Sequence, residues 1–245
     1  MSYTFHTLAQ RPEYRQRIHR LSASSWPPYL LEGNITRWKL LFDTFPEYQV
    51  LLCDAEDHLA AVGHTVPLFW NGQLSDLPHT LEEILIRAEQ VRQHQQTPNT
   101  FSALSAVVSA EHRRKRLSSR VIREMKALAQ EQSCSSLIAP VRPIWKSRYP
   151  LIPMERYVNW TRDDGSPVDP WIRVHRRLGA VPLRVAPNTL TVEAGIAAWE
   201  EWTGMRFYGS GAYIIPGALQ PAEMDLENDL GRYEDPNYWM KHPLD

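Results

Sequence analysis

Apolar and polar positions alternate with two different periods in the first hundred residues. At 12–23 and again at 35–45, apolar side chains recur every three or four positions, which predicts two helices. The run YQVLLCDAEDHLAAVGHTVPLFW, at 48–70, instead gives two β-rich segments separated by the polar tetrad DAED, and it predicts a β-hairpin. Thr80 followed by Glu83 has the spacing of a capping box, so we expect a further helix that ends before Pro98.

The segment 101–141 predicts a strand, a helix and a second strand. FSALSAVVS, at 101–109, has no charged residue and fits a buried strand. Residues 117–129 place five apolar side chains on one helical stripe, and SSLIAPV, at 135–141, is the next strand candidate. This order predicts a βαβ unit with parallel strands and a right-handed crossover.

The second half of the chain is rich in proline and tryptophan. Eight prolines lie between Pro140 and Pro187, which rules out long regular helices there. We expect irregular structure packed on the sheet, with an insertion at 143–170 and one helix at 170–178 capped by Asp169. NTLTVEAG and GAYIIPG are later strand candidates. The expected organisation is a domain at 1–194 and an irregular C-terminal extension at 195–245 packed on it.

Composition narrows the classes of protein that remain. A chain of 245 residues with 43% hydrophobic residues and a formal net charge of -1 is typical of an ordinary globular enzyme or binding domain. No apolar run approaches the roughly 20 residues that cross a bilayer, and the first residues lack the apolar core of a signal peptide, so we predict a cytoplasmic protein without a membrane partner. The balanced charge disfavours nucleic acid as a partner. Histidine and cysteine spacings predict no metal site.

The run EHRRKRLSS, at 111–119, lies between the predicted strand and the amphipathic helix. A strand that leads directly into a helix leaves the first N–H groups of that helix unpaired and its dipole positive. Such a turn binds phosphate through backbone N–H groups, and arginine or lysine beside it adds positive charge. The position of the basic run therefore predicts a pyrophosphate site.

The same residues carry a resemblance to a known family. Arg113 to Ser118 resembles the acyl-coenzyme A signature of the GNAT superfamily of N-acetyltransferases, which reads Gln or Arg, two residues, Gly, one residue, then Gly or Ala. Arg113 matches the first position, whereas Arg116 and Ser118 stand where glycine and glycine or alanine are expected. The stretch 171–180 is similar to the late helix of the family, with His175 in the place of its usual tyrosine. The resemblance covers about 48–192.

The resemblance implies an α/β (α+β) fold with a mixed, largely antiparallel sheet whose central parallel strands splay apart, flanked by helices. Acetyl-coenzyme A or another acyl-coenzyme A would be the co-substrate, without a metal. The resemblance places the pantetheine on the backbone of Ala106, Val107, Val108 and Ser109. It places the pyrophosphate on the N–H groups of Arg113, Arg114, Lys115, Arg116, Leu117 and Ser118.

Three side chains are candidates for the chemistry. His175 would protonate the thiolate, although it could instead be a structural helix histidine. His64 is a candidate base, with a satisfied sheet histidine or a water chain as the alternatives. Ser105 could donate to the thioester oxygen. Within the insertion, four cations could bind a carboxylate or phosphate of the ligand: Arg142, Lys146, Arg148 and Arg156.

The predicted function is acyl transfer from coenzyme A to a small-molecule or peptide amine by direct attack on the thioester. Two alternatives stay open. One is a non-catalytic module of the same fold that binds acyl-coenzyme A or a polyanion. The other is a decarboxylase or S-acyltransferase with this fold. Pairing into a homodimer also stays open.

Overall fold

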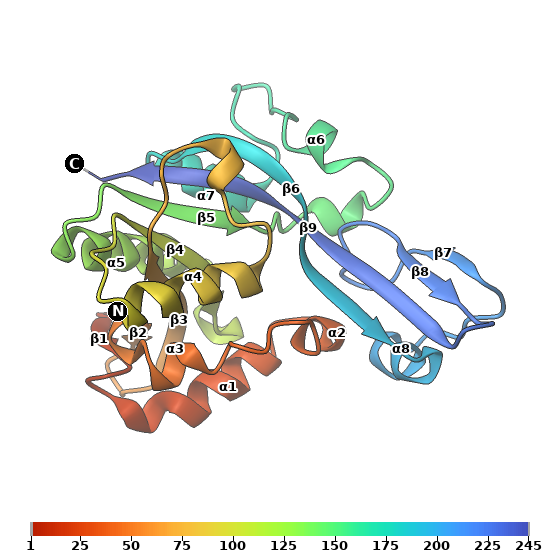
Figure 1. Ribbon diagram of the computed structural model, residues 1–245, viewed down its shortest axis with the longest axis horizontal. Helices are drawn as coiled ribbons and strands as arrows, with labels where there is room; N and C mark the ends of the chain where they lie inside the picture. The colour runs from red at the N-terminus through yellow and green to blue at the C-terminus, as the bar shows by residue number, and fades with distance from the viewer. Residues whose placement is uncertain (1, 245) are drawn as a thin grey trace.

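The computed structural model describes residues 2–244, whose nine strands form one mixed sheet (Figure 1). Neighbouring strands are antiparallel except for the pair β4–β5, and β6 lies off the main path by pairing with β9. The order along the sheet is β1 (Thr4–Thr7), β2 (Val50–Cys53), β3 (Leu59–Leu68), β4 (Thr100–Val108), β5 (Ser136–Val141), β9 (Leu230–Pro243), β8 (Ala222–Asp225) and β7 (Gly211–Tyr213), with β6 at Val181–Ala194. The predicted mixed, largely antiparallel sheet with one parallel pair is confirmed.

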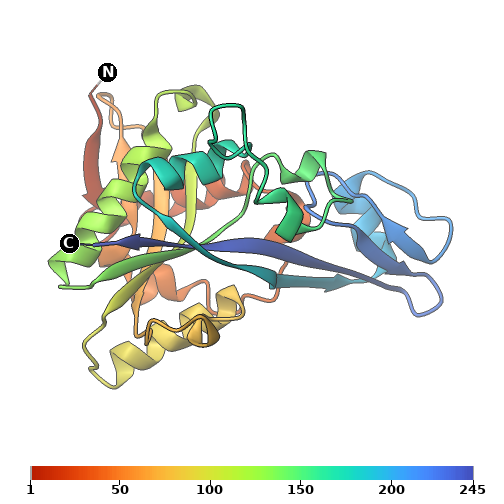
Figure 2. The ribbon, with the colours of Figure 1, turned by 90° about the horizontal axis from the view of Figure 1, so that it is seen from above.

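Helices cover both faces of the sheet, and α4 and α5 lie on opposite sides of it (Figure 2). One core joins the sheet to α1, α3 and α4, and the other joins it to α5 and α7. The helices are α1 (Arg15–Ala23), α2 (Pro28–Leu31), α3 (Leu40–Asp43), α4 (Leu81–Gln93), α5 (Leu117–Glu131), α6 (Met154–Tyr157), α7 (Pro170–Arg177) and α8 (Ile196–Thr203). Among residues 2–244, none of these helices has the length and apolar content needed to cross a membrane.

The helix α5 packs directly on β3 at Gly63. A Cβ atom at this glycine would lie 2.4 Å from Cγ1 of Val121 and 2.5 Å from Cε of Met125. Both contacts are far shorter than van der Waals distance, so the absence of a side chain lets the apolar stripe of α5 reach the sheet. The close packing fixes the height of α5 above β4.

Gly63→Ala is therefore expected to destabilise the protein by about 1–3 kcal/mol, because the added methyl group overpacks a dense core. Urea unfolding of the variant and the parent measures the difference. Gly209→Ala is a matched control, since a Cβ there would meet no atom within 4 Å. Equal midpoints for Gly63→Ala and the parent would show that α5 has room to shift.

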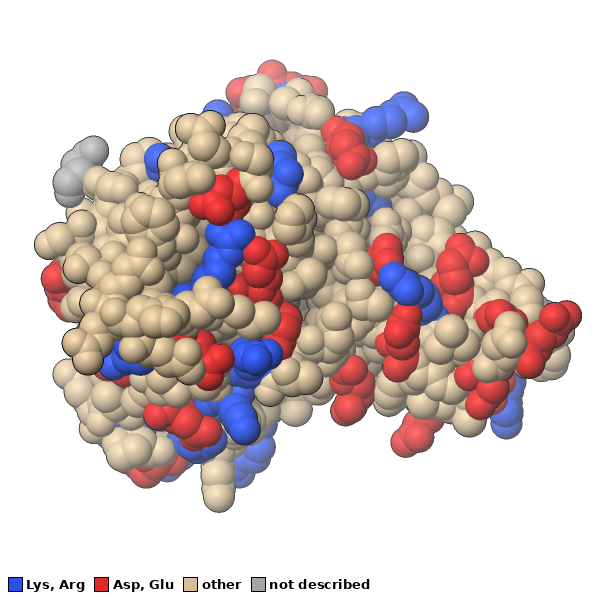
Figure 3. All heavy atoms as spheres, viewed as in Figure 1, with Lys and Arg blue, Asp and Glu red and all other residues tan. Residues whose placement is uncertain are grey.

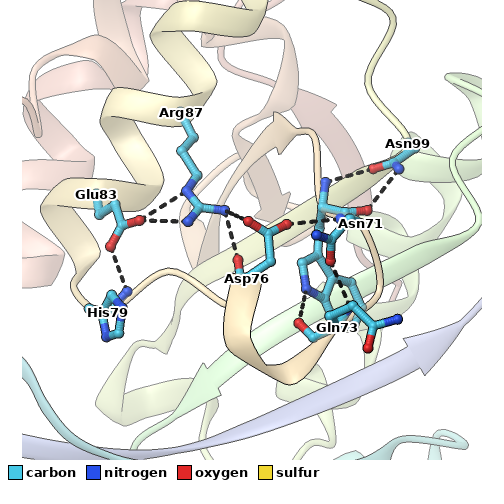
Figure 4. Close-up of polar contacts among 8 residues, drawn as sticks. Asn71, Gln73, Asp76, His79, Glu83, Arg87 and Asn99 are labelled. Carbon is cyan, nitrogen blue, oxygen red and sulfur yellow. Dashed lines mark hydrogen bonds and ion pairs between the residues drawn. The ribbon is translucent and has the colours of Figure 1, made fainter.

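The start of α4 confirms the predicted bond between Thr80 and Glu83, and Figure 4 shows the neighbouring contacts of Glu83 with His79 and Arg87. The Oγ1 atom of Thr80 accepts from the N–H of Glu83 at 3.0 Å, and the Glu83 carboxylate accepts from the N–H of His79 at 2.7 Å. The guanidinium of Arg87 then joins Glu83 to Asp76 in the preceding loop. These bonds tie the loop between β3 and α4 to the first turn of the helix.

Two expectations about chain organisation differ from the structure. The helix expected at 35–45 is reduced to the single turn α3, because most of the segment that precedes it forms turns. More important, β9 lies inside the sheet between β5 and β6, so 195–245 is not an extension beside a domain that ends at 194. Charged residues and two prolines interrupt the apolar pattern of LGRYEDPNYWMKHP, which is why the sequence did not predict a strand there.

The strands β6 and β9 continue past the main sheet as a ribbon that carries β8, β7 and α8 (Figure 1). We call this region, residues 193–234, the arm. Its core contains the buried ring of Trp199, which contacts Tyr29 of α2 at a centroid distance of 5.5 Å. The arm is thereby fixed to the N-terminal helices, and the surface is hollowed where the arm meets the rest of the molecule (Figure 3).

Candidate active site

The two parallel strands pair only at their beginning. Pairing between β4 and β5 runs from Thr100 with Ser136 to Ser102 with Ile138, and the described residues show none beyond that point. On the other side of β4, the register against β3 shifts at Leu104, as in a β-bulge. The strands therefore diverge in the manner that the sequence predicted, and backbone groups of β4 beyond Ser102 face the gap.

A cavity of about 250 Å³ occupies this divergence. Residues 103–106 of β4 and 139–142 at the end of β5 line two of its walls. The other walls are mostly apolar and come from the segment around α2, from α5 and α7, and from the parts of β6 and β9 next to the arm. Trp26, Trp38 and Leu30 are among these side chains, which leaves few polar groups in contact with a ligand.

A second, open cavity of about 580 Å³ lies at the N-terminus of α5. Its lining has five arginines and no carboxylate among the residues that the structure describes: Arg113, Arg114, Arg116, Arg123 and Arg177. Ser118 and Ser119, in the first turn of α5, complete it. A helix N-terminus with this much positive charge is suited to phosphate groups. The predicted basic turn is thus at the position where its residues can bind pyrophosphate.

The backbone of Arg116 has the conformation that glycine would adopt in this turn. Arg116 is the N-cap of α5 at φ 61°, in the left-handed region, and Arg114 has φ 64°. The side chain of Arg116 is exposed, so it does not fold into the turn. The turn keeps the shape that the family signature needs, at the cost of left-handed strain in a residue with a Cβ atom.

Arg116→Gly is expected to raise stability by about 1 kcal/mol, because glycine adopts this conformation without strain. Thermal unfolding measures that gain. Coenzyme A affinity should fall by less than about tenfold, since the N–H groups stay in place and one exposed charge is lost. A destabilised Arg116→Gly variant would mean that the arginine side chain holds the turn.

His175 lines the first cavity from α7, and only 2% of its surface is exposed. Its Nδ1 atom lies 2.9 Å from Nε2 of His242 on β9, and its ring meets Trp171 edge-on. Its Nε2 atom has no partner among the described residues. Burial, reinforced by His242, keeps the pKa of His175 well below the ordinary 6.5. Burial therefore disfavours the charged form of this ring, and the role of His175 as the acid that protonates the thiolate stays a prediction.

The other two catalytic candidates lie at different depths. Ser105 lines the first cavity. His64 does not line it. The Nδ1 atom of His64 lies 2.9 Å from Oε1 of Gln49, and its ring packs against Trp38, which lines the cavity. Burial lowers the pKa of His64 to about 3. Only Nδ1 of His64 has a partner, because Nε2 is buried without a hydrogen bond among the described residues.

Sequence reasoning missed a polar cluster in the wall of the first cavity, contributed mainly by β9. The Nε atom of Arg142 lies 3.0 Å from both carboxylate oxygens of Asp235. Asp235 also accepts from the hydroxyl of Tyr233 at 2.6 Å and from Nδ2 of Asn237 at 3.1 Å. Burial alone would lower the pKa of Arg142, but Asp235 more than offsets this and keeps the guanidinium charged. Because β9 was not predicted from the sequence, nothing indicated that these residues lie close together.

Of the four cations that were candidates for ligand binding, Arg142 lines the cavity. Lys146 is buried and donates to the backbone carbonyls of Tyr149 and Leu219. Arg148 stacks on Trp145, with its guanidinium carbon 4.7 Å from the ring centroid. Arg156 is exposed on α6. The last three are absent from the lining of both cavities described above.

Divergent parallel strands beside a basic helix N-terminus define the acyl-coenzyme A fold of the GNAT superfamily, and comparison with known proteins agrees. The fold matches the loading GNAT-like domain of CurA from Lyngbya majuscula, with a TM-score of 0.67, 17% identity and coverage of 100% of this chain and 98% of that one. It also matches the GphF GNAT-like decarboxylase in complex with isobutyryl-coenzyme A, with a TM-score of 0.62, 16% identity and full coverage of both chains.

In sequence, the chain is 32% identical over 276 residues to the arginine N-acetyltransferase avaD of Aspergillus versicolor, covering 99% of this chain and 94% of the relative. No known family profile matches the chain. The chain belongs to the GNAT superfamily and is an acyl-coenzyme A dependent N-acyltransferase. Of the two cavities, one is basic and the other is mostly apolar.

Proposed function

We propose that the protein transfers an acetyl group from acetyl-coenzyme A to an amine of arginine or of a closely related cationic molecule. The observation that carries this proposal is the edge of β4. Its residues 103–106 line the narrow cavity and Val108 lines the basic one, so one strand edge joins a phosphate site to an acceptor pocket. The near full-length relative that is named an arginine N-acetyltransferase supports arginine as the acceptor.

Backbone groups hold the co-substrate in this proposal. The free edge of β4 at Ala106, Val107, Val108 and Ser109 accommodates the pantetheine arm, because β5 has moved away from it. In this proposal the N–H groups of residues 113–118 bind the pyrophosphate, although that of Arg113 also donates to the carbonyl of Ala110 at 3.4 Å. The arginines around them add positive charge. The bound thioester supplies an activated acyl group, and no metal is part of the proposal.

The charge of the arm supports a cationic acceptor. Between residues 193 and 234 the sequence has eight carboxylate side chains and two arginines. Acidic side chains dominate the visible face of the arm, beside the hollow that separates it from the rest of the molecule (Figure 3). A surface of this sign raises the local concentration of cations and speeds their arrival.

In this proposal, Ser105 and His175 stabilise the developing charge, and water takes the proton from the amine. The hydroxyl of Ser105 and the uncharged ring of His175 lie on the cavity and can form hydrogen bonds to the charge that develops on the thioester as the amine attacks. His64 lies behind Trp38, so water is the better candidate for taking the proton from the amine. His242 orients the His175 ring through the bond between Nδ1 and Nε2.

Incubation with acetyl-coenzyme A and arginine, followed by mass spectrometry, tests the proposal. We expect acetylarginine and free coenzyme A in equal amounts. Product from other amines but not from arginine would overturn the acceptor. Loss of carbon dioxide from a malonyl thioester, without acetylation of any amine, would instead favour the decarboxylase alternative.

His175→Ala is expected to lower kcat by about 10- to 100-fold, the range for the loss of one hydrogen bond to a charged group. The dissociation constant for acetyl-coenzyme A, measured by calorimetry, should change by less than about threefold, since the phosphate site is elsewhere. His94→Ala, at the exposed end of α4, is the matched control. An unchanged kcat for His175→Ala would leave the histidine with a structural role only.

A further inference from the structure

Arg142 and Asp235 bring opposite charges into the wall of a mostly apolar cavity. Arg142 directly follows Val141, the last residue of β5, and so lies at the open end of the gap between β4 and β5. Asp235 and Asn237 reach the same cavity from β9. Since Ser105 lines the cavity from β4, the cluster and the strand edge that would hold the pantetheine enclose one space.

Most hydrogen-bonding atoms of Arg142 and Asp235 already have partners within the protein. Both oxygens of Asp235 accept from Arg142, and each accepts once more, from Tyr233 or from Asn237. The Nη2 atom of Arg142 donates to the carbonyl of Gly217 at 2.9 Å. Asp235 therefore has little capacity left for a ligand cation.

Two atoms of the cluster remain available. Within residues 2–244, neither Nη1 of Arg142 nor Oδ1 of Asn237 has a hydrogen-bond partner, and neither is sealed from the surface. Nδ2 of Asn237 is held by Oγ1 of Thr189 at 2.6 Å, which fixes the orientation of the amide. The cluster thus offers one charged donor and one neutral acceptor.

We propose that Arg142 binds a carboxylate of the acceptor, so that the acceptor is an amino acid rather than a simple amine. The inference rests on the proposed function. The ion pair with Asp235 has no net charge, so it suits a head group that carries a carboxylate and an amine together, and Oδ1 of Asn237 accepts from that amine. The methylenes and cationic end of the side chain then lie along Trp26 and Trp38.

The alternative acceptor, a simple amine, differs from an amino acid in its charge. Agmatine is arginine without its carboxylate and carries more positive charge at neutral pH, so the acidic arm alone would favour agmatine. Only a specific contact to the carboxylate reverses that order. Argininamide keeps the shape of the head group and removes its negative charge.

The experiment compares kcat/KM of the intact protein for L-arginine, argininamide and agmatine, with acetyl-coenzyme A in excess. We expect arginine to exceed both analogues by about 10- to 100-fold, the range for a charge-assisted hydrogen bond. Equal or higher values for agmatine or argininamide would overturn the inference and leave the proposed function standing. If none of the three is acetylated while another amine is, the proposed acceptor fails first.

A double variant assigns the preference to Arg142. Arg142→Gln with Asp235→Asn removes both charges and keeps amide hydrogen bonds, so no buried charge is left unpaired. The ratio of kcat/KM for arginine to kcat/KM for agmatine should fall to within about threefold of unity, because only the contact to the carboxylate is lost. Arg148→Gln, stacked on Trp145 away from the cavity lining, should keep the parent ratio. A double variant that folds and retains the full preference would overturn the inference. If the double variant does not fold, the kcat/KM values of the intact protein for the three acceptors decide.

Discussion

Ser118→Glu is expected to abolish acyl-coenzyme A binding while the protein stays folded. Ser118 is the second residue of α5 and lines the basic cavity. A carboxylate in the first turn of a helix interacts favourably with the helix dipole, by about 0.3–1 kcal/mol. The same carboxylate would stand within a few ångströms of the pyrophosphate, where like charges repel by about 4 kcal/mol each at an intermediate dielectric constant. Coenzyme A affinity should fall about 100- to 1000-fold.

Calorimetry with coenzyme A measures this loss, and thermal unfolding checks that the helix is intact. Ser118→Ala is the control, because it introduces a residue that the family signature accepts at this position and should bind within a few-fold of the parent. Tight binding by Ser118→Glu would contradict a pyrophosphate site at the start of α5. Equal losses for Glu and Ala would point to the hydroxyl group rather than to charge.

The protein is expected to lose stability steeply as the pH falls below 6.5. Burial lowers the pKa of His64 to about 3, and it also lowers the pKa of His175 and of His242 below the ordinary 6.5. Above 6.5 these residues are uncharged in both the folded and the unfolded states, so they make no difference. Below 6.5 the unfolded chain takes up protons that the folded protein excludes, and stability falls until the folded-state pKa values are reached.

The slope of stability against pH depends on how many buried histidines exclude protons. Each histidine contributes up to about 1.4 kcal/mol per pH unit, so the three together contribute roughly 4 kcal/mol per unit at the steepest point. Urea midpoints measured between about pH 7 and about pH 5 give the slope in a window above the titration of ordinary carboxylates. His64→Gln should reduce it by roughly a third. A flat profile from pH 7 to 5 would mean that these rings are hydrated in solution.

Local patterns predicted the part of the chain where we propose that the co-substrate binds. The strand, basic turn and helix are consecutive in sequence, and the periodicity of 117–129 sets the helix that positions the turn. The capping signals at Thr80 and Asp169 were also sufficient to place two helix starts. In each case the information lies within a few residues of the structure that it determines.

The proposed acceptor pocket depends on contacts between distant segments, which is why the sequence did not reveal it. Arg142 meets Asp235 across 93 positions of the chain, and His175 meets His242 across 67. These pairs exist only because β9 lies beside β5. Its alternation of charged and apolar residues reflects functional side chains on a strand, and that pattern is indistinguishable from a surface segment without knowledge of its neighbours.

The place of β9 has a consequence for how the enzyme is made. During synthesis the ribosome delivers β5 nearly a hundred residues before its partner strand, so the nascent chain holds an incomplete sheet with an open edge for several seconds, at roughly 5–20 residues per second. Asp235, Asn237 and His242 all arrive with that last strand. Catalytic competence should therefore appear only after residue 243 has left the exit tunnel.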